Sequence, residues 1–404
     1  MKVEKLNKKV NFILKIGNAF HKYGTNSPRL ELALTNIATF IGVKGNFFST
    51  PTYLAISIDN NDNQITRHIR VTPGEVDLEK LCAVDQVGDL VCKGDLNISD
   101  AVQKLDQIDN APPRYNKTIS VTAFGLTSLA LAIIFGGNFI DASFSFAVGS
   151  VLGVLAIFTS KATRFADIFE FLAAFICTLM AYTIKHYFPA THFQIVLMAS
   201  LIVIIPGLSL TIAMVELAAQ NLVSGTARFM GAMVDFFKIS FGVMSGVQVG
   251  KFIYSTMAPN NSTPLPEYWI IPAIVIGSLA FTIIFKAKPK DLKWILLSGL
   301  AAIFSIKPSN LFVSDIMSIF IAGIVVGAGS NIFARVYNRP AMIPLLPGII
   351  FLVPGSVGFK GINLIFETNY AQGLGTGFQM FIIAITIVAG LFLANVLVNP
   401  RRSL

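Results

Sequence analysis

The chain has 404 residues, of which 54% are apolar and only 13% are charged, and its mean hydropathy is +0.67. Soluble domains carry roughly 25% charged residues, so a soluble globular enzyme is excluded. Residues 1–115 hold 14 Lys/Arg and 13 Asp/Glu, whereas residues 116–404 hold 17 and 9. The sequence therefore predicts a near-neutral α/β domain at 1–115 followed by a polytopic α-helical membrane domain.

The first 115 residues predict a mixture of helices and strands. Helical periodicity covers about 5–23 and 28–42, with Ser27 as the N-cap of the second helix and Pro28 in its first turn. An apolar run at 53–58, a polar turn at 59–63 and an alternating run at 64–71 predict a hairpin. Two further helices are expected at 77–92 and 99–109. No signal-peptide region opens the chain, so this domain is expected in the cytoplasm.

The rest of the chain contains ten nearly uncharged stretches, and each predicts a transmembrane helix. They lie at about 118–140, 142–160, 165–184, 193–217, 229–254, 268–285, 292–306, 313–334, 340–359 and 371–399. The seventh is short, but its flanking lysines can snorkel to the interface. In this ten-span topology, twelve Lys/Arg fall on the cytoplasmic side of the membrane and four on the outer side. This distribution favours a multi-pass inner (plasma) membrane protein with cytoplasmic N- and C-termini.

A weak internal repeat divides the membrane domain. A shift of 148 residues aligns Pro206-Gly207 with Pro354-Gly355. Two five-helix halves follow, spans one to five at 116–254 and spans six to ten at 268–404, joined by an extracytoplasmic linker at 255–267. Because five is odd, the halves have opposite topology, and inverted repeats are a transporter architecture. Chance matches between apolar segments would also explain the alignment.

Interrupted spans predict where a solute could bind. A regular helix has already used its amides and carbonyls, so a membrane-embedded site needs a broken helix. Pro206 and Gly207 interrupt the fourth span, and Pro354, Gly355 and Ser356 interrupt the ninth. Half-helix ends in corresponding spans could hold a carboxylate and an ammonium group. Packing kinks are the alternative interpretation.

Ionisable groups inside spans are the second pointer to function, because they are costly there. Asp235 and Lys238 lie at i, i+3 in the fifth span and share one helical face. The hypothesis is that Asp235 takes up the coupling proton while Lys238 tunes it or contacts an acidic substrate; a buried structural ion pair is the alternative. Glu216, near a span end where water could solvate it, and Asn331, among small residues typical of helix packing, are further candidates.

Several other functions are disfavoured. Most of the net charge of +9 lies in the membrane part, where Lys/Arg mark cytoplasmic loops, so no nucleic-acid partner is expected. The three cysteines form no CxxC pair and have no His at zinc-ligand spacing, so neither metal nor cofactor is expected. A membrane-anchored hydrolase is the alternative class, but residues 1–115 hold only His21 and His68 and lack a GxSxG, HExxH or phosphate-binding glycine motif. A passive channel is left open.

Four segments in order resemble one known family. They are SPRLE at 27–31, IGVKGNFFSTPT at 41–52, GDLNIS at 94–99 and LVPGSVG at 352–358. Together with the two-part layout they are similar to the threonine/serine exporter family (ThrE). The resemblance implies export of threonine and serine, driven by the proton motive force, by a cytoplasmic domain joined to about ten spans. Two-component relatives are associated with export of dicarboxylates such as succinate. The implied partners are a small-molecule substrate, protons and membrane lipid; a homo-oligomer is left open.

Overall fold

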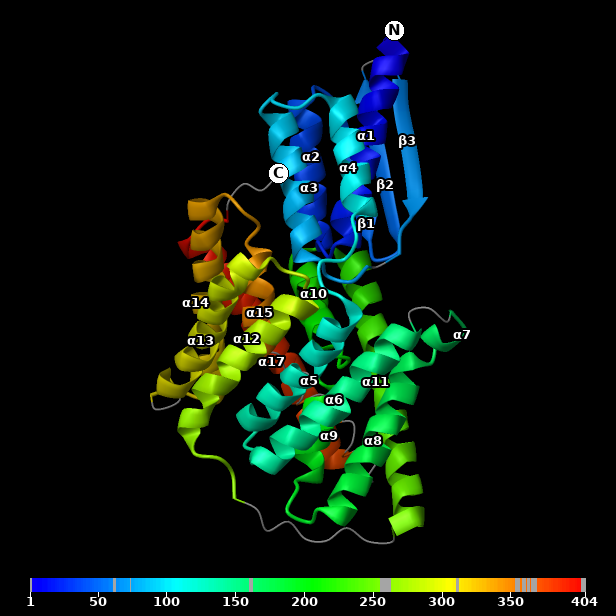
Figure 1. Ribbon diagram of the computed structural model, residues 1–404. Helices are drawn as coiled ribbons and strands as arrows, with labels where there is room; N and C mark the ends of the chain where they lie inside the picture. Colours follow the sequence, from blue (N-terminus) through cyan, green and yellow to red (C-terminus); the bar gives the residue numbers. More distant parts are fainter. Residues whose placement is uncertain are drawn as a thin grey trace.

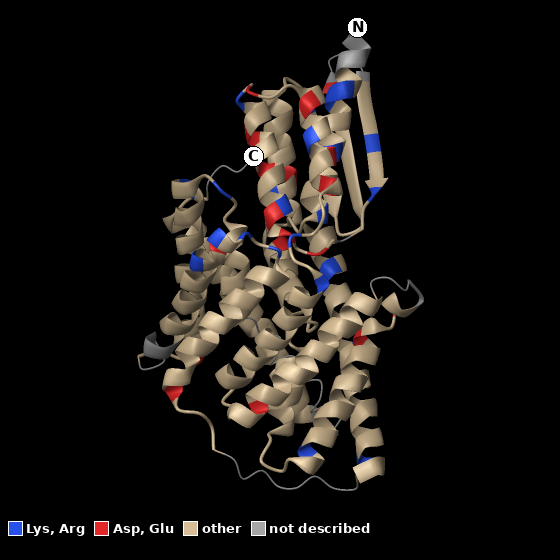
Figure 2. Cartoon of the chain, viewed as in Figure 1, with Lys and Arg blue, Asp and Glu red and all other residues tan. Residues whose placement is uncertain are grey.

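The computed structural model describes residues 2–60, 63–72, 74–159, 163–254, 263–309, 312–352 and 369–400, together with Val357, Gly361 and Leu364. Its N-terminal elements form a layer stacked on one end of a helical bundle (Figure 1). This N-terminal layer comprises α1 (Lys2–Lys22), α2 (Ser27–Phe40), β1 (Lys44–Thr50), β2 (Tyr53–Asn60), β3 (Asn63–Arg70), α3 (Leu78–Cys92) and α4 (Ile98–Asn110). Charged side chains gather in the layer and where it meets the bundle (Figure 2).

The sheet of the N-terminal layer has three antiparallel strands in the order β1-β2-β3. The predicted hairpin is confirmed as β2 and β3, with Ile58 opposite Ile65. Alternate residues Leu54, Ile56 and Ile58 of β2 are fully buried, as expected for a sheet with one face on a core. Strand β1 was not predicted, because its sequence KGNFFST contains Gly and Asn and no Val or Ile.

The start of α2 corrects one prediction. The N-cap is Asn26, whose side chain accepts a hydrogen bond from the Arg29 N–H at 3.4 Å, and not Ser27. Ser27 is the first helical residue, and its polar atoms bind partners in the bundle instead. Pro28 lies in the first turn as predicted, where its missing N–H leaves no bond unmade.

The bundle is built from α5 (Lys117–Ile134), α6 (Phe139–Thr159), α7 (Thr163–Ala166), α8 (Phe169–Tyr187), α9 (Phe193–Leu201), α10 (Gly207–Ala218), α11 (Leu222–Tyr254), α12 (Ile270–Ile284), α13 (Leu292–Ser309), α14 (Asp315–Tyr337), α15 (Met342–Leu352) and α17 (Tyr370–Leu397). Short 3-10 turns precede α12, at Glu267–Trp269, and α13, at Pro289–Asp291. Six helices of the described chain are long and apolar enough to cross a membrane. They are α5, α6, α11, α14, α17 and α12 with its preceding turn. The protein is therefore a mostly helical polytopic membrane protein.

The fourth predicted span is broken in two. Helix α9 ends at Leu201, and α10 begins at Gly207 with Pro206 as its N-cap. Proline lacks an N–H and clashes with a preceding helical turn, so the break falls where the Pro-Gly step predicts it. In the ninth stretch, α15 contains Pro347 and is described as far as Leu352. Pro354, Gly355 and Ser356 lie outside the described residues.

The N-terminal layer and the bundle share one hydrophobic core. Buried residues of α1, α2, β2, α3 and α4 form a single cluster with Phe281 of α12, with Phe285 directly after α12, and with Met342 and Leu346 of α15. A backbone bond from the Leu78 N–H to the Phe285 carbonyl, 2.9 Å long, joins the two parts directly. Within the bundle, α8 packs along α11, and α14 packs along α17. The N-terminal layer is therefore docked on the bundle by apolar as well as polar contacts.

Candidate functional site

A cavity of about 310 Å³ lies where the N-terminal layer meets the bundle. Helix α10 supplies one wall through Leu208, Thr211, Ile212, Val215 and Ala219, which share one helical face. The other walls come from α14, α15 and α17, and the first turns of α2 close the side that faces the N-terminal layer. The cavity reaches the size range of small-molecule sites, and its lining begins at Leu208, two residues after the break at Pro206.

Three polar side chains of the bundle line this cavity. Thr211 donates its hydroxyl to the Gly207 carbonyl, 3.1 Å away, in the first turn of α10. On the facing wall, the Asn331 amide of α14 donates to Asn395 Oδ1 of α17 and to the Val398 carbonyl, both at 2.8 Å. Asn331 was a predicted site residue, and the structure places it in the cavity wall. The amide pair gives the cavity a hydrogen-bonding surface between α14 and α17.

Two arginines also line the cavity, Arg29 from α2 and Arg339 from the turn between α14 and α15. The Arg339 guanidinium binds both carboxylate oxygens of Asp291, with Nη2 at 2.8 Å from Oδ2. Its charge is therefore neutralised by a bidentate partner. Among the residues that the structure describes, no Asp or Glu lines the cavity. The charged side chains of the described lining are therefore both arginines.

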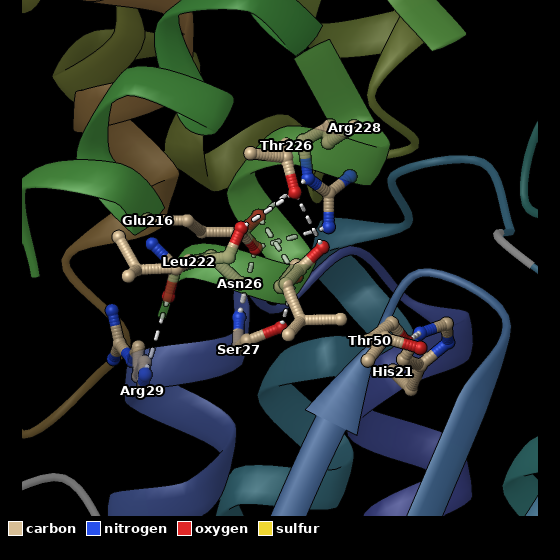
Figure 3. A network of polar contacts seen from close by, with 11 residues as sticks. His21, Asn26, Ser27, Arg29, Thr50, Glu216, Leu222, Thr226 and Arg228 are labelled. Carbon is tan, nitrogen blue, oxygen red and sulfur yellow. Dashed lines mark hydrogen bonds and ion pairs between the residues drawn. The ribbon is translucent and has the colours of Figure 1, made fainter. Parts of the chain in front are cut away.

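Behind the cavity wall, Glu216 of α10 is the centre of a buried polar network (Figure 3). Arg228 of α11 donates to both of its carboxylate oxygens, from Nε at 3.1 Å and Nη2 at 3.2 Å. The Ser224 hydroxyl donates to Oε2 at 2.9 Å, and the Ser27 N–H donates to Oε1 at 3.1 Å. The two serine hydroxyls are 2.7 Å apart. One fully buried carboxylate therefore ties α2 of the N-terminal layer to α10 and α11; these four residues are called the docking network.

Two titratable side chains of the N-terminal layer flank the docking network. Glu31 of α2 accepts from the Ser49 N–H at 2.8 Å and from the Asn221 amide at 3.2 Å. Burial raises the pKa of Glu31, and these two hydrogen bonds oppose the shift. His21 of α1 donates from Nε2 to the Thr50 carbonyl, 3.0 Å away. Burial lowers the pKa of His21, which this bond partly offsets. A fall in pH therefore weakens the docked interface through His21 and strengthens it through Glu31.

A second cavity, of about 120 Å³, lies on the other side of the broken span. Residues of α5, α12 and α15 line it, together with Ile202, Val203 and Ile205 of the unwound segment between α9 and α10. Leu208 lines both cavities. The first turn of α10 therefore forms part of the boundary between the two spaces.

The structure brings few of the other predicted site residues together. Asp235 and Lys238 share one face of α11 and form the predicted ion pair, 3.8 Å apart, with side chains that are 39% and 34% exposed, so the pair is half-buried. Lys238 is nearer to Glu170 in the first turn of α8, at 3.3 Å. Asp235 and Lys238 do not line the 310 Å³ cavity. Glu216 was expected to be solvated near a span end; instead it is fully buried, because Arg228 and two serines replace water.

Sequence reasoning missed Arg29, Ser27 and Arg228. Ser27 and Glu216 are 189 positions apart, and no local pattern pairs them. A signal does exist for Arg228, since it lies one helical turn after Ser224 near the start of α11. Glu216 lies near the end of α10, and three residues connect the two helices. Such a pair across a helix-helix connection could have been proposed from the sequence.

Two family models match the chain. The model ThrE, described as "Putative threonine/serine exporter", matches residues 11–250, and the model ThrE_2, described as "Threonine/Serine exporter, ThrE", matches residues 271–397. The chain belongs to the ThrE family. The family is one of exporters and not of enzymes, and membership agrees with the six membrane-spanning helices. The gap between the two matches includes the predicted linker at 255–267.

Several curated relatives of this ThrE chain are fungal proteins. An uncharacterised protein of Schizosaccharomyces pombe is 26% identical over 97% of this chain and 56% of its own length. Pheromone-regulated membrane protein 10 of Candida albicans is 25% identical over 96% of the chain and 38% of its own length, and that of Eremothecium gossypii is 23% identical over 96% and 56%. The chain thus spans about half or less of the length of these relatives. No solved structure matches it.

Proposed function

We propose that this chain is a secondary active exporter that moves threonine and serine out of the cytoplasm at the expense of the proton motive force. Family membership supports an exporter of small molecules. The observation that carries the proposal is the 310 Å³ cavity beside the broken α9–α10 span, because it is large enough for a small amino acid and has one polar wall. Cavities at interrupted helices are where secondary transporters bind their solutes.

The two-half architecture of the membrane part belongs to the same proposal. We assign the ten predicted stretches to helices in two inverted halves. The first half comprises α5, α6, α8, α9 with α10, and α11, and the second comprises α12, α13, α14, α15 and α17. The third and fifth members pack together in both halves, as α8 with α11 and as α14 with α17. This equivalent packing in the two halves supports a repeat. Residues 1–115 are proposed to be a separate domain that gates the cavity.

Export of dicarboxylates such as succinate is the second candidate, and one observation favours it. The described cavity lining contains two arginines and no carboxylate that could hold an ammonium group. A zwitterionic amino acid would have to place its ammonium against the Asn331–Asn395 amides and Thr211. The anchored-hydrolase alternative gains no support from the comparisons, and a passive channel is separated from a pump only by measuring accumulation against a gradient.

Two carboxylates are proposed as carriers of the coupling proton. Asp235 with Lys238 is the first pair, and Lys238 also contacts Glu170 of α8. Glu216 is the second, since it lies on α10 directly behind the cavity and is paired with Arg228. Both pairs put a carboxylate next to a cation, so that uptake of a proton would release the cation.

Proteoliposomes provide the test of substrate and energy coupling. Vesicles are given an imposed pH gradient and offered labelled serine, threonine or succinate, with a protonophore as the control. Accumulation of serine or threonine against its concentration gradient, abolished by the protonophore, is expected. Accumulation of succinate alone would select the second candidate, and transport of none of the three would overturn the proposal. Equilibration without accumulation would indicate a channel.

We also propose that both termini and the N-terminal layer face the cytoplasm of a plasma-membrane protein, with 255–267 outside. Asn260→Cys and Lys288→Cys, each as a single cysteine in a cysteine-free background, test this orientation. An impermeant thiol reagent should label the first in intact cells and the second only after permeabilisation. The reverse labelling pattern would invert the topology.

A further inference from the structure

A polar cavity of about 350 Å³ lies between the N-terminal layer and the bundle, apart from the proposed solute site. One wall is the face of α3 between Cys82 and Leu90, and the other is formed by the α12–α13 connection and by the turn between α14 and α15. Of the described lining residues, only Arg339 also lines the 310 Å³ cavity. We propose that this α3 cavity binds the phosphate group of an anionic membrane lipid.

The bundle wall of the α3 cavity supplies positive charge. Lys288 and Lys290 come from the α12–α13 connection, and Arg339 comes from the turn before α15. Arg339 is bound to both oxygens of Asp291, so its charge is already neutralised. Lys290 is exposed, and Lys288 approaches Glu79 only to 4.0 Å, where an ion pair near the surface contributes little. The two lysine ammonium groups can therefore turn toward a bound anion.

The carboxylates of the described lining lie on the opposite wall. Asp85 and Asp89 are one helical turn apart on α3, and Lys93 follows one turn later. Asp85 is buried, and Asp89 accepts a hydrogen bond from the Asn338 amide at 3.4 Å. The charges of the cavity are therefore segregated, and a phosphate group is best bound at the bundle wall, away from the two carboxylates.

An aromatic cluster places the bundle wall at a membrane interface. Tyr337 lines the α3 cavity and packs on Trp294 of α13, with ring centroids 4.8 Å apart. Phe333 packs on both rings, and the Lys293 ammonium lies over Trp294, 5.1 Å from the ring centroid. Tryptophan, tyrosine and lysine gather where the hydrocarbon of a bilayer meets its headgroups. The cavity therefore opens beside the headgroup layer.

Exposed apolar side chains continue from the cavity along the bundle. Ile332 and Val336 share one face of α14 and are 51% and 67% exposed, and Leu297 of the adjacent α13 is 53% exposed. A lipid with its phosphate at Lys288 and Lys290 can lay its acyl chains on these residues, whereas a soluble phosphate ester gains nothing from them. Basic pockets at the headgroup level of a helical bundle are sites for anionic lipids. These contacts favour a lipid over a soluble ligand.

Quenching of Trp294 fluorescence by brominated lipids measures the binding. The chain has two tryptophans, so Trp269→Phe leaves Trp294 as the single tryptophan, beside the α3 cavity. The purified full chain is placed in mixed micelles of a neutral maltoside with brominated phosphatidylglycerol or brominated phosphatidylcholine at equal mole fractions. Because phosphatidylglycerol carries a net negative charge and phosphatidylcholine does not, we expect the first to bind at least tenfold more tightly.

Two lysine substitutions test the charge of the bundle wall. Lys288→Gln with Lys290→Gln should reduce the preference for phosphatidylglycerol by about 10- to 30-fold, because each lysine beside an anionic headgroup contributes a factor of about five. Lys104→Gln with Lys286→Gln removes the same charge from residues outside the described lining, and it should leave the preference unchanged. A preference that survives the Lys288 and Lys290 substitutions would overturn the inference.

A second pair of variants fills the cavity and changes no charge. Gln86 lines the α3 cavity, whereas Gln103 of α4 lines none of the described cavities, and both side chains are exposed. Gln86→Phe should weaken the binding of phosphatidylglycerol at least tenfold, and Gln103→Phe should not. Equal binding by these two variants would show that the lipid lies outside the cavity and would overturn the inference.

Glycerol 3-phosphate separates a lipid from a soluble phosphate ester, because it carries the phosphate without acyl chains. At a concentration equal to that of brominated phosphatidylglycerol, it should leave the quenching of Trp294 unchanged. Displacement of the lipid under these conditions would overturn the lipid assignment and identify a soluble phosphate ester as the ligand. Equal quenching by the two brominated lipids would overturn the site altogether. None of these measurements depends on transport, so the proposed function can fail separately.

Discussion

Removing the charge of Glu216 should release the N-terminal layer from the bundle. Glu216 is fully buried, and its carboxylate accepts four hydrogen bonds from Arg228, Ser224 and Ser27. The side chain of Arg228 is only 21% exposed. Deleting one member of a buried ion pair leaves the other uncompensated, which costs about 3–5 kcal/mol. We expect Glu216→Gln and Arg228→Gln each to reduce the free energy of unfolding by this amount.

The double variant provides the internal check. With both charges removed, no uncompensated ion remains, so Glu216→Gln with Arg228→Gln should lose less than the sum of the two single losses, by at least about 2 kcal/mol. Glu75→Gln is the surface control, because Glu75 is 82% exposed and its bond to Lys286 should contribute at most about 1 kcal/mol.

Hydrogen exchange measures the effect where it should occur. Amides of α2 and β1 should exchange faster in both single variants, while those of α6, which packs against α5, α8 and α9 and contributes no residue to the docking network, should be unchanged. Thermal unfolding in detergent gives the stability ranking of the four proteins. If Glu216→Gln is no more destabilising than Glu75→Gln, or if the two single effects add without interaction, the docking network does not hold the layer in place.

Three further predictions concern His21, Glu31 and the Asp235–Lys238 pair. Burial lowers the folded-state pKa of His21, so the stability that its neutral form provides is complete above about pH 6.5 and is lost as the pH falls below that value; His21→Gln should abolish this pH dependence in thermal unfolding between pH 5 and 7.5. Burial raises the folded-state pKa of Glu31, so its stabilising contribution is present below its ordinary pKa and is lost as the pH rises through the folded-state pKa. Glu31→Gln should therefore raise the melting temperature at pH 7 but not at pH 4.5. A lower melting temperature of Glu31→Gln at pH 7 would contradict this. Asp235→Asn with Lys238→Met should fold with a loss of no more than about 1 kcal/mol, because removal of both charges leaves neither member of the pair uncompensated. That variant should exchange serine but not concentrate it in proteoliposomes, and full gradient-driven export would transfer the coupling role to Glu216.

The apolar stretches and the broken span follow from local chemistry. A run of uncharged residues predicts a helix because lipid leaves no other partner for the backbone. Pro206-Gly207 predicts the break because proline lacks an N–H and clashes with the preceding helical turn, and glycine adds backbone freedom. Both features depend on residues adjacent in sequence. The hairpin of β2 and β3 is predictable for the same reason, since its turn and alternation are local.

The bonds of Ser27 to the bundle could not be predicted, because they join residues far apart in the sequence. Ser27 reads as an N-cap, yet Asn26 takes that role and leaves Ser27 to reach Glu216 in a helix 189 positions away. The depth of Asp235 in the membrane is not predictable from the sequence either. Helix α11 has 33 residues, about 50 Å, and exceeds the hydrocarbon thickness, so sequence alone does not fix the depth of a charge within it.

Serine flux through a blocked cavity tests the account most directly. Val215 lines the 310 Å³ cavity, whereas Val234 is 49% exposed on α11 and lines none of the described cavities. Val215→Phe and Val234→Phe add the same volume at these two positions, and each protein is reconstituted at equal density with labelled serine and a pH gradient. The account predicts that Val215→Phe loses at least nine tenths of the flux while Val234→Phe retains the wild-type rate. Equal flux in the two variants would contradict it.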